Sequence, residues 1–255
     1  MKKKYAFSII LIAILMLGGA IGLLLTNISN PWNARRLGDI PAPFGYQRVE
    51  AENGSYAAFL RDLPLKKRGS KVMLYSGKEA NYQFLSAAVI DMPVISNDEQ
   101  CADMTMRLRA EYLWMKGRYK ELCFTGVDGK KYQYPGGETR SSFESWLKRV
   151  YGICNTSSVY KETKERALKD IEPGDVLVYT SRKKGRYGHA ILVADVARNR
   201  HGKIAVLCVE GNTPARDAHV VRNPNPLMSS WHILSEKDVY QVSAFRFHHN
   251  ELRHY

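Results

Sequence analysis

Cysteine is scarce in this sequence, with four residues among 255, which excludes a small scaffold built on disulfides. The 19 glycines and 10 prolines follow no period, which excludes collagen-like and low-complexity chains. Neither an HExxH nor a CxxC pattern occurs, and no glycine-rich phosphate-binding or dinucleotide-binding pattern is present outside the apolar N-terminal run. We therefore expect no metal site and no cofactor. Hydrophobic residues make up 45% of the chain, enough for a sizeable core, so a wholly disordered chain is also excluded.

Charge is absent from a long stretch near the N-terminus, between Lys4 and Arg35. Within it, Ala6 to Leu25 is a run of twenty residues that is apolar except for Ser8 and three glycines. A helix of twenty residues spans about 30 Å, the thickness of the hydrocarbon core of a bilayer. The run is longer than the apolar part of a cleaved signal peptide, which is about 7–15 residues. The sequence therefore predicts one N-terminal transmembrane helix, an uncleaved signal anchor over residues 1–30.

The excess of basic residues predicts on which side of a membrane the rest of the chain lies and which partners it contacts. Lys2, Lys3 and Lys4 favour the cytoplasmic side, which places the domain on the periplasmic or other extracytoplasmic side of a bacterial inner membrane. The remainder carries 35 basic and 25 acidic residues, a net charge of +10. Anionic lipid headgroups, a polyanionic cell wall and a merely solvated basic surface are all compatible with this charge. No arginine-rich arm or zinc-finger pattern accompanies it, so we expect no nucleic-acid partner; the oligomeric state is not indicated.

The rest of the chain divides into a linker and one domain. Residues 31–43, rich in Asn, Pro and Arg, predict a linker, and residues 44–255 predict an α+β domain in which helices pack on an antiparallel sheet. Helices are expected near residues 55–61, 97–117, 142–151 and 160–169. Strands are expected at residues 46–49, 71–75, 87–90, 119–125, 176–179, 189–197, 204–209, 219–221 and 242–247, the last five as an antiparallel meander.

Three polar residues in chain order form the candidate catalytic site. Cys101 lies at the start of a predicted helix, His189 opens a strand and Glu210 closes the next strand. The positive end of a helix dipole lowers the pKa of a thiol, whereas Asp98 and Glu99 oppose this effect, so the direction of the shift stays open. A histidine nearby can take the thiol proton and return it to a leaving amine, while a carboxylate holds its second ring nitrogen. Together the three residues predict nucleophilic catalysis by Cys101.

Three further residues are candidates for supporting roles. Gln100 precedes the thiol and can donate to an oxyanion together with the Cys101 N–H. Asn212 stands behind Glu210 as a second holder of the imidazole, and His219 follows on another strand. Ordinary structural interpretations exist as well, because a lone cysteine on an apolar helix face belongs to the core and a lone histidine often ends a strand. Chain order and local context favour the catalytic interpretation.

The segments around these residues resemble those of CHAP-type and NlpC-type cysteine amidases and endopeptidases. The similar segments are Gly174–Tyr179, Gly188–Val193 and Val209–Asn212, together with the pair Gln100–Cys101, since the CHAP pattern also has Gln before its nucleophile. The resemblance implies a papain-like fold. It also implies that Cys101 is the nucleophile, His189 the base and Glu210 the orienting group.

A broader resemblance covers nearly the whole of residues 40–235. The segments Asp62–Lys66, Gln100–Leu113 and Gly188–Asn223 are similar to an exported bacterial family known only as a domain of unknown function. In that family the position of Glu210 is more often Gln. Either side chain can accept a hydrogen bond from an imidazole N–H.

The sequence thus predicts a membrane-anchored envelope cysteine hydrolase that cleaves an amide bond, with peptidoglycan or another envelope peptide as its partner. The alternative is a catalytically inactive papain-like domain that acts as an envelope binding or scaffold module. An acyltransferase of the lipid-handling branch of this superfamily is disfavoured, because that branch has His before Cys in the chain. Replacing Cys101 by Ala separates the first two hypotheses, since only an enzyme should lose its role.

Overall fold

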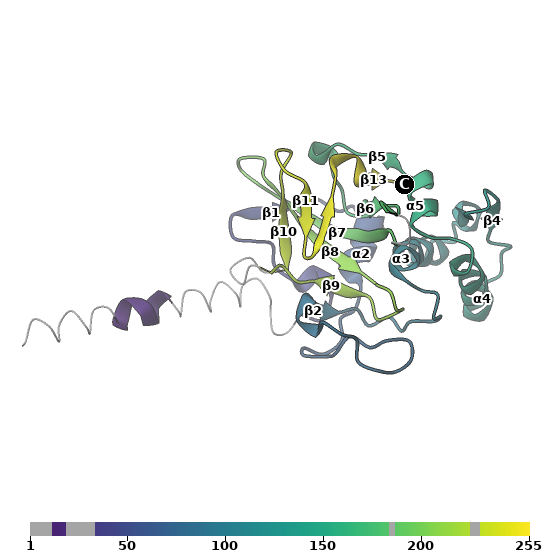
Figure 1. Cartoon of the computed structure of the whole chain (residues 1–255), viewed down its shortest axis with the longest axis horizontal. Coiled ribbons are helices and arrows are strands. Elements are labelled where there is room, and N and C mark those ends of the chain that lie inside the picture. The colour runs from purple at the N-terminus through teal and green to yellow at the C-terminus, as the bar shows by residue number, and fades with distance from the viewer. Residues whose placement is uncertain (1–11, 19–33, 184–186, 225–229) are drawn as a thin grey trace, which may run out of the picture.

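A nine-stranded sheet crosses the centre of the described structure (Figure 1). The computed structural model describes residues 12–18, 34–183, 187–224 and 230–255. The middle of the sheet is formed, in chain order, by β6 (Val176–Tyr179), β7 (His189–Asn199), β8 (Ile204–Glu210) and β9 (His219–Val221). Each of these strands pairs antiparallel with the next, which confirms the predicted α+β class and the antiparallel order of these four strands.

Shorter strands extend the sheet on both sides. They are β2 (Ser86–Val89) beside β9, β13 (Leu252–His254) beside β6, β5 (Lys164–Glu165) beside β13, β1 (Tyr46–Arg48) beside β7 and β10 (Trp231–Leu234) beside β8. Two separate hairpins lie outside the sheet, β3 (Cys123–Thr125) with β4 (Lys131–Gln133) and β11 (Tyr240–Val242) with β12 (Phe245–Phe247). The sheet therefore joins segments from both ends of the described domain.

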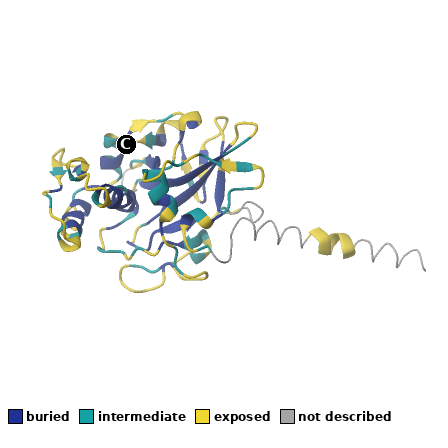
Figure 2. Cartoon of the chain, turned by 180° about the vertical axis from the view of Figure 1, so that it is seen from behind, coloured by how far each residue is buried: buried dark blue, intermediate teal, exposed yellow. Residues whose placement is uncertain are grey.

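The central strands are buried on both faces, and Figure 2 shows them in dark blue along most of their length. Leu192 and Val209 belong to the larger of the two main apolar clusters, which also contains buried apolar residues of helix α3 (Cys101–Met115), such as Met104 and Leu108. Val193 and Cys208 belong to a second cluster, which contains Phe247 of β12. Continuous apolar runs are typical of strands covered on both faces, which explains why these segments were predictable.

The helices confirm three of the four predicted segments with small shifts at their ends. They are α2 (Tyr56–Asp62), α3, α4 (Arg140–Tyr151) and α5 (Thr156–Glu162). The helix predicted over residues 160–169 is wrong beyond Glu162. There, Lys164 and Glu165 pair with the C-terminal strand β13, a long-range contact that outweighs the local helical pattern.

Three predicted strands also differ from the structure. Residues 71–75 form only isolated bridges, at Met73 and Leu74. Residues 119–125 begin as a 3-10 turn before β3. Residues 242–247 are divided at Ser243, where the chain turns with a φ of 51°. Val242 ends β11, and Phe245–Phe247 form β12, which pairs with β11 in a hairpin outside the meander. The 3-10 turns are η1 (Leu37–Asp39), η2 (Gln83–Leu85), η3 (Tyr119–Glu121), η4 (Leu168–Asp170) and η5 (His249–Glu251).

The packed domain begins before its predicted boundary at residue 44. Leu37 and Ile40 are fully buried in the larger cluster, and the Leu37 N–H donates to the Leu63 carbonyl over 2.9 Å. The linker predicted over residues 31–43 is therefore shorter than expected, because its last apolar residues pack against the α2 region.

The predicted signal anchor over residues 1–30 lies outside the described residues except for 12–18. Those seven residues are helical, and their side chains are exposed. Among the described parts of the chain, no helix combines the length and the apolar character that crossing a bilayer requires.

Candidate active site

The candidate site lies where helix α3 meets one end of strands β7 and β8. Cys101 is the first residue of α3, His189 the first of β7 and Glu210 the last of β8. Because β7 and β8 are antiparallel, the start of one and the end of the other lie at the same edge. Helix α3 packs against β7 and brings its N-terminus to this edge. The structure therefore brings together three residues that lie far apart in the sequence.

Gly211 allows β8 to end directly beside the first turn of α3. A Cβ atom at this position would lie 3.1 Å from Met104 Cβ and 3.3 Å from the Gln100 carbonyl oxygen. Such contacts are tighter than ordinary van der Waals packing, so a larger residue would push the two elements apart. The glycine after Glu210 thus keeps the carboxylate close to the start of the helix.

His189 links the other two candidate side chains. Its interaction with the Cys101 thiol lowers the pKa of the thiol and raises that of the imidazole. On the other side of the ring, His189 Nε2 lies 2.9 Å from Glu210 Oε2. The carboxylate therefore occupies Nε2, which leaves Nδ1 for the sulfur. In this arrangement an imidazole can exchange a proton with the thiol while a carboxylate holds its orientation.

The pKa values of the three groups favour their charged forms. Burial raises the pKa of the Cys101 thiol, but the hydrogen bond and charge of His189, with two backbone N–H groups, bring it below its ordinary value. Burial lowers the pKa of His189, whereas its hydrogen bonds to Cys101 and Glu210 raise it to about 9. Burial raises the pKa of Glu210, but hydrogen bonds from His189 and His219 lower it to about 2. For Cys101 and His189, both shifts increase the share of the thiolate–imidazolium pair relative to the neutral pair.

The two acidic residues before Cys101 do not reverse this shift. Glu99 is buried, and its carboxylate lies 2.7 Å from Nη1 of Arg107 on α3, so Glu99 is paired with a cation of this helix. Asp98 is exposed, where water and salt screen its charge. The sequence left the direction of the Cys101 pKa shift open, and in the structure this pKa is lowered.

His219 is the predicted supporting residue that contacts the carboxylate. It is the direct partner of Glu210 across strands β8 and β9. Its Nδ1 donates to the Asp217 carbonyl oxygen over 3.0 Å, and its Nε2 lies 3.4 Å from Glu210 Oε1. Both oxygens of Glu210 thus face an imidazole, which fixes the orientation of the carboxylate.

Gln100 and Asn212, the other predicted supporting residues, both contact Thr213. The side-chain oxygen of Gln100 accepts from the Thr213 hydroxyl over 2.8 Å, which leaves the Gln100 amide N–H groups available for a second acceptor. The side-chain oxygen of Asn212 accepts from the Thr213 N–H, also over 2.8 Å. Asn212 therefore shapes the loop after β8, and Glu210 is the residue that holds the imidazole.

A cavity of about 490 Å³ opens beside Cys101. The cysteine is only 7% exposed, yet it lines this cavity. Polar residues from several segments form the walls, among them Asn155, Thr180 and Thr213. Tyr187 also lines the cavity and is 85% exposed, so it lies at the outer edge. Cys101 thus borders a cavity of the size that small-molecule sites have.

Sequence reasoning missed three residues near the sulfur and the imidazole. Asp103 and Tyr151 line the same cavity in buried positions. Asp103 Oδ1 and the Tyr151 hydroxyl have no hydrogen-bond partner within the described ranges. Phe245 of β12 stacks on the His189 ring, with centroids 3.7 Å apart. An acidic residue in a first helical turn is an ordinary feature, and Tyr151 and Phe245 come from distant segments, so no local pattern marked them.

Comparison with known proteins identifies one family. Its description reads Domain of unknown function (4846), and its profile matches residues 38–136 and 135–254. Neither the curated proteins nor the solved structures contain a match to this chain.

Proposed function

The chain belongs to the family described as Domain of unknown function (4846), and from its site we propose that it is a cysteine hydrolase that cleaves an amide bond. One observation carries this proposal: beside an open cavity, His189 is hydrogen-bonded to Glu210 and interacts with the Cys101 thiol, whose pKa it lowers. A buried structural cysteine needs neither an imidazole partner nor a lowered pKa. Perturbed pKa values in a cleft favour a catalytic role.

The first half of the reaction forms a thioester. The Cys101 thiolate attacks the carbonyl carbon of the amide, and the electrons of the C=O bond move to the oxygen, which becomes an oxyanion. When the oxyanion collapses, the C–N bond breaks, and His189 donates its proton to the leaving amine. Glu210 keeps the imidazole oriented and stabilises its charged form.

The second half of the reaction restores the enzyme. Neutral His189 accepts a proton from water, and the resulting hydroxide attacks the thioester carbonyl carbon. The C–S bond then breaks, the acid product leaves, and the thiolate and imidazolium are restored. The Cys101 N–H at the start of α3 and the Gln100 amide N–H groups are the donors nearest to the oxyanion.

The arrangement supports a papain-like domain of the CHAP or NlpC type. A nucleophile at the start of a helix, a histidine at the start of a strand and a polar residue on the next strand follow the chain order that the resemblance implies. The helix packs on an antiparallel sheet, as this type of fold requires. The alternative role, an inactive envelope scaffold, shares this fold but does not need the perturbed thiol.

The substrate class follows from the cavity and from the N-terminal segment. Polar walls suit the backbone and side-chain groups of a peptide. An apolar run of twenty residues after three lysines supports an inner-membrane anchor with the domain on the extracytoplasmic side. Peptidoglycan stem peptides or another envelope peptide are the amides that a hydrolase meets there.

The test uses the full chain in uncharged detergent micelles. We expect it to release peptide fragments from purified peptidoglycan, detected by mass spectrometry, and Cys101→Ser to abolish the release. Cys123→Ser is the matched control, since Cys123 is a free cysteine in the separate β3–β4 hairpin. Iodoacetamide should modify Cys101 faster than Cys123 at pH 7. Absence of both product and fast modification would overturn the hydrolase proposal and favour the inactive scaffold.

A further inference from the structure

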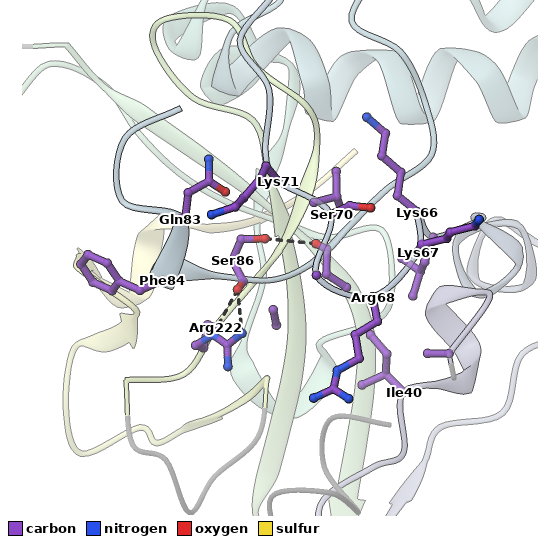
Figure 3. A pocket seen from close by; sticks show the side chains of 16 residues that line it. Ile40, Lys66, Lys67, Arg68, Ser70, Lys71, Gln83, Phe84, Ser86 and Arg222 are labelled. Carbon is purple, nitrogen blue, oxygen red and sulfur yellow. Dashed lines mark hydrogen bonds between the residues drawn. The ribbon is translucent and has the colours of Figure 1, made fainter. Parts of the chain in front are cut away.

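A second cavity, of about 410 Å³, lies beside strand β2 (Figure 3). Its walls come from Ala34 and Ile40, from the loop at residues 65–71, from residues 83–84 and 86–89, and from Arg222 after strand β9. None of its lining residues belongs to the cavity beside Cys101. It is therefore a separate site, with its own chemistry.

Positive charge dominates this second cavity. Its lining includes five basic residues, Lys66, Lys67, Arg68, Lys71 and Arg222, and no acidic residue. Figure 3 shows Arg222 on one side of the cavity and Lys66 and Lys67 on the other. Two carboxylates approach from outside the lining: Asp217 lies 2.8 Å from Lys66 Nζ and Glu79 lies 3.8 Å from Lys71 Nζ. Among the described residues, the four cations other than Arg68 outnumber these two carboxylates, and this excess of positive charge favours an anionic ligand.

Gln83 holds the backbone directly after Lys71 in place. The Gln83 side-chain oxygen accepts from the Val72 N–H over 2.9 Å. Its side-chain nitrogen donates to the Val72 and Ala80 carbonyl oxygens over 2.9 and 2.8 Å. Arg222 is fixed as well, because its guanidinium donates to the Ser86 carbonyl oxygen. The cavity is therefore preorganised, which lowers the entropy cost of binding.

Exposed aromatic rings lie beside the cations. Phe84 lines the cavity and is 68% exposed, and Tyr82, also 68% exposed, packs edge-on against it with centroids 6.1 Å apart. Free phosphate in water gives such rings nothing to contact. Aromatic rings next to basic side chains are typical of protein surfaces at the interface between water and a bilayer.

The number of residues between the apolar N-terminal run and the cavity limits how far apart the two can lie. Ala34 lines the cavity, and the run ends at Leu25, nine residues earlier. Nine extended residues reach at most about 30 Å. If the run is in a bilayer, the cavity lies within that distance of the lipid surface.

We propose that this cavity binds the phosphate of an anionic phospholipid headgroup and so seats the domain on the membrane surface. The lysines neutralise the lipid charge, and Phe84 with Tyr82 contacts the boundary between headgroups and acyl chains. The inference rests on the N-terminal anchor and not on hydrolysis at Cys101. The two proposals can therefore fail independently.

The experiment uses the full chain in uncharged dodecyl maltoside micelles and three probes. These are dihexanoylphosphatidylglycerol, dihexanoylphosphatidylcholine and inorganic phosphate. Hydrogen–deuterium exchange is followed at residues 65–73 and 82–89 as each probe is titrated. We expect the anionic lipid to slow exchange there, and the zwitterionic lipid and phosphate to leave it unchanged at the same concentrations.

Matched double variants test which cations are responsible. Lys67→Gln with Lys71→Gln should raise the midpoint concentration of the anionic lipid roughly 30-fold, since each basic residue contributes about a fivefold effect. Lys120→Gln with Lys148→Gln removes the same charge from exposed positions outside the cavity and should leave the midpoint unchanged. If the first pair misfolds, Lys67→Gln alone should shift the midpoint about fivefold.

Three results would overturn the inference. Exchange at these segments could be unaffected by the anionic lipid. Inorganic phosphate could slow it equally well, which would identify a free-phosphate site. The midpoint could also stay the same in the Lys67 and Lys71 variants. Iodoacetamide modification of Cys101, measured on the same samples, reports separately on the catalytic proposal.

Discussion

Glu210 Oε2 lies 2.9 Å from His189 Nε2, and this single contact decides which ring nitrogen faces the sulfur of Cys101. A carboxylate on Nε2 leaves Nδ1 for the thiol and stabilises the imidazolium. Glu210 therefore acts on His189 in two ways, as a hydrogen-bond acceptor and through its negative charge. Two substitutions can separate them experimentally.

Glu210→Gln keeps the acceptor and removes the charge. We expect the pKa of His189 to fall from about 9 toward its ordinary 6.5, so the imidazolium beside the thiolate becomes less populated at pH 7. Glu210→Ala removes the acceptor as well, and the misoriented imidazole should cost about 10²–10⁴-fold in amide cleavage. The rate of Cys101 alkylation as a function of pH measures the first effect, and product release measures the second.

Glu52→Gln is the control for these variants, because Glu52 is exposed and lies outside the cavity beside Cys101. A Glu210→Gln protein with the unaltered pH profile would show that the charge of Glu210 does not tune the imidazole.

The same pKa shifts predict how stability depends on pH. The folded-state pKa of His189 is about 9, above its ordinary 6.5, so its stabilising contribution is complete below pH 6.5 and is lost as the pH rises through 9. The folded-state pKa of Glu210 is about 2, below its ordinary 4.5, so its contribution is present above pH 4.5 and is lost as the pH falls through 2. The pair should therefore stabilise the fold most between pH 4.5 and 6.5.

Urea unfolding of the micelle-bound chain at pH 3, 5.5 and 9 measures this contribution. Other groups titrate over the same range, so the quantity to compare is the difference in free energy of unfolding between the unaltered chain and Glu210→Gln. That difference should be largest at pH 5.5. A difference that does not vary with pH would contradict the assigned shifts.

Gly188 tests whether backbone packing positions His189. A Cβ atom at this position would lie 2.3 Å from the Tyr179 carbonyl oxygen and 2.4 Å from Thr156 Oγ1. We expect Gly188→Ala to lower the free energy of unfolding by about 1–3 kcal/mol through overpacking and to slow Cys101 alkylation by displacing the imidazole. Urea unfolding and iodoacetamide kinetics measure the two effects. In Gly152→Ala, the control, the new Cβ would meet nothing closer than 3.7 Å, so both values should stay near those of the unaltered chain.

The sequence was sufficient to predict that Cys101, His189 and Glu210 lie together at the candidate site. Strands β7 and β8 are apolar along their lengths, and polar residues stand where they end, so His189 and Glu210 were visible as interruptions of a local pattern. Cys101 was visible because it precedes a long helical pattern. Because these signals are local, each can be recognised in a single sequence without the structure.

Features that depend on distant contacts were not predictable. Residues 164–165 leave the predicted helix because they pair with a strand near residue 253, and Leu37 enters the core by contact with Leu63. Phe245 reaches the His189 ring from a hairpin whose position no local pattern indicates. The basic cavity is assembled from several separated segments, so the sequence showed its basic residues only as part of the net positive charge of the chain.

Asp103 is the residue whose replacement should improve stability while harming function. It is buried beside Cys101, its Oδ2 accepts from the Gln100 N–H over 3.2 Å, and its Oδ1 has no partner in the described part of the chain. Burial raises its pKa well above the ordinary 3.8, so the folded protein is destabilised increasingly as the pH rises above that value. Asp103→Asn keeps an acceptor for Gln100 and removes this penalty. We therefore expect a higher free energy of unfolding than in the unaltered chain at pH 7, and nearly the same value at pH 3.5.

A buried carboxyl that destabilises the fold is expected at a site that uses it. We therefore expect the same Asp103→Asn protein to bind the amide substrate more weakly, with KM raised more than kcat is lowered. Asp103 lines the cavity, and in the described part of the chain it makes no hydrogen bond to the side chains of Cys101, His189 or Glu210. Asp98→Asn, an exposed carboxylate lining the same cavity, is the control and should change neither stability nor KM comparably. Stability that falls at pH 7 in Asp103→Asn would show that the carboxyl has a hydrogen-bonding role which the asparagine cannot supply.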